Sequence, residues 1–244
     1  PGTFINFFSF VNATYTTDAI STSQQVDENL IRTTKPVNVK NNYSIDATMH
    51  FGFPLKVIKS RVGIRTSAVS SNGITLLNTV ENSIQRTTLG GMFRYSLSLD
   101  EVYNLDLSAS LEEQKSEYQF DVQDQSFLNK TYEAESNLKM LKNYQFNAQF
   151  QFMDYSSRTT GFSQTIPLLN ISFSRFLFKN KGEFKVGVNN LLDKNININQ
   201  TTNTNYLEQR TSNNIGRYFM ASFTYALNKQ LNPMAGTRGH MIRR

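Results

Sequence analysis

The sequence predicts an all-β protein, an antiparallel up-and-down transmembrane β-barrel of about ten strands. Apolar and polar residues alternate along most of the chain, which places successive side chains on opposite faces of a strand. No segment shows a comparable helical pattern, and the stretches between the alternating segments are alternately short and long. This rhythm is typical of a meander whose two ends face different environments.

Composition excludes several classes of protein. The chain has 244 residues, no Cys and two His, so disulfides and cysteine-ligated metal sites are excluded. No run approaches 18 consecutive apolar residues, which excludes a transmembrane helix. The net charge is +6, but Lys and Arg are scattered, so we expect no nucleic-acid partner. Pro1 is not followed by a signal-like segment, so either such a segment has been removed or the chain starts within a larger protein.

The alternation predicts ten strands. The clearest example covers 143–155, where aromatic residues and Ala share one face and amides share the other; segments starting at Tyr43, Tyr103 and Tyr132 repeat the pattern. In chain order we expect strands at 3–16, 30–53, 59–69, 82–98, 102–119, 131–141, 143–156, 165–178, 182–191 and 214–227. Short connections are expected at 53–56, 99–101, 141–143 and 179–182, and long polar loops at 17–29, 70–81, 120–130, 157–164 and 192–213.

A soluble β-sandwich also alternates, but three details favour a membrane barrel. The polar faces are rich in Gln, Asn and Ser with few runs of charge, aromatic residues bracket the apolar rows, and most segments are long enough to cross an apolar band of about 25 Å. In hydrocarbon an unpaired backbone group costs several kcal/mol, so the sheet must close. A soluble β-protein stays as the weaker alternative, and it requires Phe146, Phe150 and Phe152 to be covered by protein.

Within each strand, odd-numbered and even-numbered residues point to opposite faces, and this parity assigns the side chains to two environments. The lipid-facing residues are predicted to be Tyr144, Phe146, Phe150, Phe152, Phe219, Phe223 and Tyr225. Charged residues of the opposite parity are the candidates for contact with substrate or with a plug: Asp46, His50, Arg61, Arg65, Arg94, Asp106, Glu133, Glu135 and Lys185. Glu133 and Glu135 lie about 7 Å apart on one face, but alternation alone produces that spacing. We therefore expect no catalytic residue, no metal site, no cofactor and no enzymatic activity.

Two positions test the parity. Arg175 shares its face with apolar residues, and an Arg at mid-membrane costs about 2–4 kcal/mol, so we place it near the rim or behind a bulge that inverts the parity. The pair Gly90-Gly91 lies within a strand and predicts a bulge or a kink.

The C-terminal third resembles a known superfamily. The segment 182–195, GEFKVGVNNLLDKN, looks like the penultimate strand of TonB-dependent outer-membrane receptors, and 214–227, NIGRYFMASFTYAL, resembles their last strand. Upstream, 36–39 (PVNV) and 51–56 (FGFPLK) resemble the Bacteroidota-type outer-membrane β-barrel family of that superfamily. The specific motifs are confined to 182–227.

The resemblance implies a bacterial outer-membrane location and a 22-stranded parent barrel closed around an N-terminal plug, which imports large solutes with energy relayed by TonB. The chain would supply the C-terminal barrel strands, 1–227, with short turns in the periplasm and 228–244 as a periplasmic tail. Its partners would be outer-membrane lipid, the plug, the remaining strands, TonB and a surface lipoprotein. The alternative is a self-contained ten-stranded barrel that acts as a small channel, an adhesion or assembly protein, or a surface protease; its first and last strands would pair.

Overall fold

The computed structural model describes residues 4–29, 31–100, 102–120, 124–194, 196–202, 207–213 and 215–227. Within them the fold is all-β, and the single helical element is a 3-10 turn, Lys56–Ile58. None of the helical structure in this part of the chain is long and apolar enough to cross a membrane. The predicted all-β antiparallel class is confirmed.

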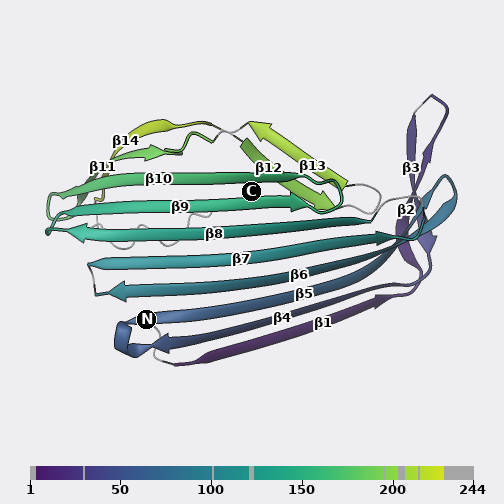
Figure 1. Cartoon of the computed structure of the whole chain (residues 1–244), viewed down its shortest axis with the longest axis horizontal. Coiled ribbons are helices and arrows are strands. Elements are labelled where there is room, and N and C mark those ends of the chain that lie inside the picture. The colour runs from purple at the N-terminus through teal and green to yellow at the C-terminus, as the bar shows by residue number, and fades with distance from the viewer. Residues whose placement is uncertain are drawn as a thin grey trace.

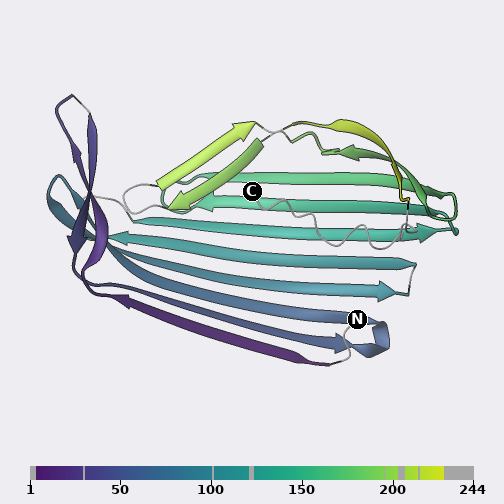
Figure 2. The same cartoon turned by 180° about the vertical axis from the view of Figure 1, so that it is seen from behind.

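Ten strands form one continuous antiparallel path that curves into a trough (Figure 1). Each strand on this path is hydrogen-bonded to the next, and the same order of strands is seen from behind (Figure 2). The path ends at β1 and β14, which do not pair with each other, so the sheet is open. Its strands are, in spatial order, β1 (Asn6–Thr16), β4 (Asn42–Leu55), β5 (Ser60–Leu77), β6 (Val80–Leu99), β7 (Tyr103–Tyr118), β8 (Gln125–Met140), β9 (Tyr144–Ser157), β10 (Ser163–Leu177), β11 (Gly182–Asn189) and β14 (Tyr218–Tyr225).

The predicted single strand 30–53 is wrong, because it divides into β3 (Arg32–Val39) and β4. The predicted loop 17–29 is also wrong, since it contains β2 (Ala19–Val26), which pairs with β3. This hairpin projects from one end of the trough (Figure 1). Among the described residues it joins the main sheet through a short parallel contact of β2 with β5 and a hydrogen bond from the Asn78 N–H to the Gln24 carbonyl. β3 has a single neighbour, so its edge position accepts Pro36, which cannot donate to a second strand.

Of the other predicted long loops, 70–81 is mostly strand and 120–130 contains the start of β8, whereas 157–164 is a loop between β9 and β10 except at its ends. β5 and β6 continue through 70–81 to a two-residue turn at Asn78-Thr79, where both residues have positive φ, as in a type I′ hairpin. β8 already begins at Gln125 and β10 at Ser163. Residues 70–73 of β5 carry no apolar side chain on either face, so the alternation of β5 is interrupted there, although its backbone remains paired with β6.

The predicted loop 192–213 contains a hairpin of its own. β12 (Ile196–Thr202) and β13 (Leu207–Asn213) follow β11 and precede β14 in the chain. They pair with each other as a separate two-stranded sheet. The predicted tail, 228–244, lies outside the described residues.

The predicted short connections are confirmed, and they all lie at one end of the trough, opposite the β2–β3 hairpin (Figure 1). Left-handed residues make these reversals tight, including Lys59, Asp100 and Leu141. The Lys59 ammonium lies 2.8 Å from the Asp100 carboxylate and so ties two adjacent turns together.

No bulge interrupts the two positions that test the parity. Of the predicted bulge or kink at Gly90 and Gly91, the bulge is absent, because the registers of β6 with β5 and with β7 run unbroken through both residues; the kink stays a prediction. A Cβ at Gly90 would approach the Ser67 hydroxyl to 2.4 Å, which shows that the neighbouring side chain uses this space. Arg175 also lies in an unbroken register, and its face is therefore that of Phe173.

Candidate functional site

The register divides the side chains of the trough into two faces, because directly opposed residues of an antiparallel pair project to the same side. The nine predicted lumen residues all lie on one face, and the seven predicted lipid residues all lie on the other. That the two groups lie on opposite faces follows from the strand pairing. That one face meets water and the other meets lipid stays a prediction.

The face with the predicted lipid residues carries an apolar band. It covers 144–152 on β9 and 103–111 on β7, and the next residues on this face are Asp154 and Glu113. Nine residues at about 3.3 Å rise and about 40° tilt span roughly 20 Å, close to the height of a membrane barrel's apolar band. Phe219 on β14 is 80% exposed, so nothing in the described chain covers this end of the band.

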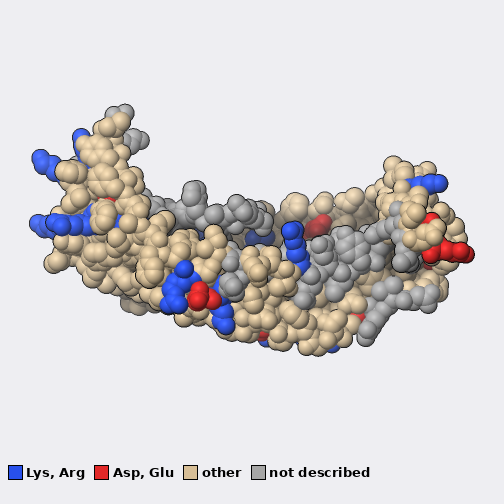
Figure 3. All heavy atoms as spheres, turned by 90° about the horizontal axis from the view of Figure 1, so that it is seen from above, with Lys and Arg blue, Asp and Glu red and all other residues tan. Residues whose placement is uncertain are grey.

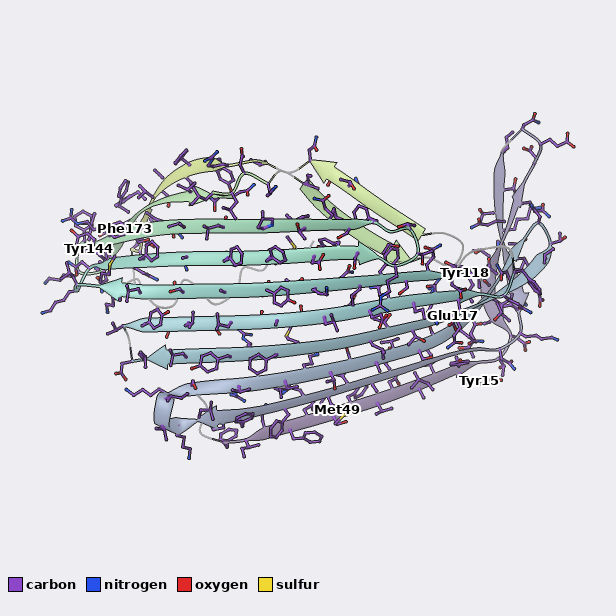
Figure 4. The ribbon with its side chains drawn as sticks, viewed as in Figure 1. Tyr15, Met49, Glu117, Tyr118, Tyr144 and Phe173 are labelled. Atoms are coloured by element: carbon purple, nitrogen blue, oxygen red, sulfur yellow. The ribbon has the colours of Figure 1, made fainter. Side chains whose placement is uncertain are left out.

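Aromatic rings mark the turn end of the band. Tyr144 and Phe173 stack with ring centroids 5.6 Å apart, and both lie near the short turns (Figure 4). The Arg175 guanidinium lies 5.6 Å from the centre of the Tyr144 ring. This cation–π contact stabilises the charge of Arg175, the one arginine of β10 on this face.

Charged pairs mark the other edge of the band. Lys130 contacts Asp154 at 3.1 Å, and Arg158 contacts Glu113 at 3.0 Å. Glu117, whose carboxylate contacts the Lys115 ammonium, lies still farther from the turns (Figure 4). From above, the visible surface is largely uncharged, with charged atoms near the two ends, in a mixed patch between them and in a few smaller groups (Figure 3).

The opposite, polar face is tied together by side-chain hydrogen bonds. The Glu133 carboxylate accepts from the Ser108 hydroxyl at 3.0 Å and from the Gln151 amide at 2.9 Å. The Asn147 amide donates to Asn137 at 2.7 Å. Glu135 accepts from the Asn137 amide at 3.2 Å. These carboxylates are therefore held by wall residues rather than aimed together at a reacting group.

Four of the predicted charged residues surround one hollow of about 380 Å³: His50, Arg61, Arg65 and Arg94. His50 and Arg65 are directly opposed on β4 and β5, while Gly63 and Arg94 are opposed on β5 and β6. Arg94 contacts Asp106 on β7 at 3.3 Å, so the basic cluster borders the acidic residues of β7 and β8. Asp46 lies on the same face of β4 as His50, two side chains farther along that face. Lys185 lies apart from the hollow, on β11.

Sequence reasoning missed two glycines at this basic hollow: Gly63 lines it, and Gly52 leaves space beside it for the contact between Asn6 and Arg61. Gly52 and Gly63 are opposed on β4 and β5, on the polar face. A Cβ at Gly52 would approach the Asn6 amide oxygen to 2.4 Å and the Arg61 guanidinium to 3.2 Å. Asn6 and Arg61 are hydrogen-bonded to each other across the space that Gly52 leaves. The signal available in the sequence was Gly63 between Arg61 and Arg65 on the polar face, whereas its opposition to Gly52 is set by the register.

The motif residues of the C-terminal third form a structural clamp. The buried Asn190 has φ 51°, and its side-chain amide donates to the carbonyls of Lys194 at 2.6 Å and of Ile215 at 3.3 Å. Asp193 accepts from the backbone N–H of Arg217 at 2.7 Å. A Cβ at Gly216 would lie 2.8 Å from the same carboxylate. These contacts fasten the exit of β11 to the entry of β14.

The sheet therefore has two features on its polar face: a surface of hydrogen-bonded side chains and a basic hollow. Among the described residues, no three His, Asp or Glu side chains converge as a metal site requires. The absence of enzymatic activity stays a prediction.

Comparison with known proteins agrees with this architecture. No curated protein matches the chain. Residues 57–225 match the model of the outer membrane protein beta-barrel family, and these residues include every strand of the main path from β5 onward. The match covers more than half of the chain, and it accounts for a sheet with one apolar and one polar face. The protein therefore belongs to the outer membrane protein beta-barrel family and is located in the bacterial outer membrane.

Proposed function

We propose that the chain forms the C-terminal barrel wall of a TonB-dependent-receptor-like transporter that imports large solutes. In this arrangement the apolar band contacts lipid and the polar face lines the lumen. The short turns lie in the periplasm, and the β2–β3 hairpin stands on the cell surface. The plug, TonB and a surface lipoprotein are the proposed partners, and the wall itself performs no covalent chemistry.

The observation that carries this proposal is the open sheet. β1 and β14 both end the strand path with unpaired edges, although the apolar band continues onto each of them. An unpaired edge in hydrocarbon costs several kcal/mol for each unsatisfied group, so further strands must cover it. Strands of a larger barrel supply that cover. The likeness of 182–227 to the last two receptor strands supports the same conclusion.

The alternative, a self-contained ten-stranded barrel, requires β1 to pair with β14. Ten closed strands would also leave little lumen, because eight strands are already filled by their own side chains whereas 22 strands need a plug. Strand pairing therefore separates the two candidates.

Disulfide trapping tests the proposal. Residues 1–244 contain no cysteine, and any cysteine elsewhere in the gene product is first replaced by serine. Ala221→Cys on β14 is combined in turn with Val11→Cys, Ala13→Cys and Tyr15→Cys on β1, all on the apolar face. The full gene product is oxidised in native outer membranes and analysed for intrachain crosslinks by gel mobility. We expect no crosslink with any of the three.

The matched control joins two strands that are paired in the structure. Ala47 and Ala68 are directly opposed on β4 and β5, also on the apolar face, so Ala47→Cys with Ala68→Cys should crosslink. Efficient β1–β14 crosslinking beside a working control would show a closed ten-stranded barrel and overturn the proposal.

A further inference from the structure

We propose that the hollow floored by Gly63 is a binding site for a small oxyanion with at least two negative charges, such as a polycarboxylate or a phosphate. This inference deepens the proposed function and rests on it, because it names the chemical class of solute that the polar face would accept.

The hollow is built from three adjacent strands whose register brings the cationic groups together. Arg61 and Arg65 flank Gly63 along β5, His50 is opposed to Arg65, and Arg94 is opposed to Gly63. Because Gly63 has no side chain, the guanidinium groups surround an open centre rather than a packed one. A Cβ placed at Gly63 would make only ordinary contacts, 3.9 Å from Arg94 and from His50.

The charge of this hollow is not neutralised by the wall. Arg94 has a carboxylate partner, Asp106, at 3.3 Å. Arg61 is hydrogen-bonded to Asn6, which is neutral. Arg65 is exposed and has no ion-pair or hydrogen-bond partner within the described part of the chain. Two permanent positive charges are therefore left for a ligand, and His50 adds a further polar ring.

The shape of the site fits a small ligand. Its volume of about 380 Å³ is at the lower end of the range for small-molecule pockets. Guanidinium groups present planar pairs of donors that match carboxylate and phosphate oxygens. The exposed Met92 provides an apolar wall on one side. An oxyanion satisfies both the charge and the donor geometry, whereas a neutral solute would leave the arginines unmatched.

Calorimetric titration of the full gene product in detergent micelles tests the site, with citrate and inorganic phosphate as probes at constant ionic strength. We expect saturable binding of at least one probe. Arg61→Gln and Arg65→Gln should each weaken it about tenfold, since each removes a charge-assisted contact, and the double variant should abolish it. Gly63→Met should also abolish binding, because it fills the hollow without removing charge.

Two controls match these variants. Lys185→Gln removes a charge from the same face outside the hollow, and Gly91→Met adds the same side chain on the opposite face, where a Cβ meets nothing within 4 Å. Both should bind like the unaltered protein. Absence of saturable binding by both probes, or binding that survives in the double variant, would overturn the inference. Calorimetric titration does not measure strand pairing. A negative titration would therefore overturn the binding site without changing the disulfide-trapping result on the barrel.

Discussion

Replacing Asn190 with glycine should destabilise the folded barrel by about 2–4 kcal/mol. Asn190 is buried at the exit of β11, and its side-chain amide makes three hydrogen bonds. Glycine keeps the positive φ of 51° without strain, so this substitution isolates the loss of the side chain.

The magnitude follows from the groups that lose their partners. The carbonyls of Lys194 and Ile215 lose a donor, at 2.6 and 3.3 Å, and the Lys194 N–H loses an acceptor at 3.1 Å. Each bond contributes about 0.5–1.5 kcal/mol net, so the three together contribute about 1.5–4.5 kcal/mol, and the stated range is the central part of that interval. Asn190→Ala should cost about 1 kcal/mol more, because a Cβ disfavours the left-handed conformation.

The assay is urea unfolding of the protein refolded into lipid vesicles, followed by tyrosine fluorescence and by gel mobility. Asn189→Ala is the matched control, since Asn189 occupies the adjacent strand position and its side chain makes no hydrogen bond to any described residue. It should change stability by less than about 0.5 kcal/mol. If Asn190→Gly were as mild as this control, the clamp would not hold β11 to β14.

Three further substitutions test other parts of the structure. Phe150→Arg should reduce the heat-modifiable, membrane-assembled fraction by an amount that corresponds to about 2 kcal/mol, while Gln149→Arg on the polar face should be mild; equal effects in the gel assay would refute the facing of β9. Arg175→Gln should cost no more than about 1 kcal/mol in urea unfolding, because it removes only an exposed cation–π contact, and a larger loss would show that this position is deeper than the rim. Gly52→Ala should displace Asn6 and weaken anion binding by the hollow; unchanged binding would show that the Arg61 position does not depend on this gap.

Alternation predicted the central part of the fold because membrane barrels impose a period of two wherever one face is apolar. β9 was predicted at 143–156 and is found at Tyr144–Ser157 for this reason. The pattern failed at the far end of β5, where 70–73 has no apolar side chain on either face, and there only backbone pairing with β6 shows the strand. The hairpin turn at Asn78-Thr79 contains no glycine, so no turn signal marked it.

The same rule explains what could be predicted of the basic hollow. Parity placed His50, Arg61, Arg65 and Arg94 on one face, because each lies on a strand with a clear alternation. It could not show that they surround one space, since this depends on the register between β4, β5 and β6. The stagger of neighbouring strands is set by the hairpin turns and cannot be read from each strand separately.

The central claim is that the aromatic rows meet lipid and the amide rows meet water. Site-directed spin labelling measures this directly, with a nitroxide placed in turn at each position from 144 to 153 of the protein in membranes, since the chain has no native cysteine to interfere. Collision rates with oxygen, which concentrates in lipid, should peak at even positions, and rates with a water-soluble nickel chelate should peak at odd positions. Oxygen and nickel rates that rise and fall together, or oxygen maxima at the odd positions, would contradict the account.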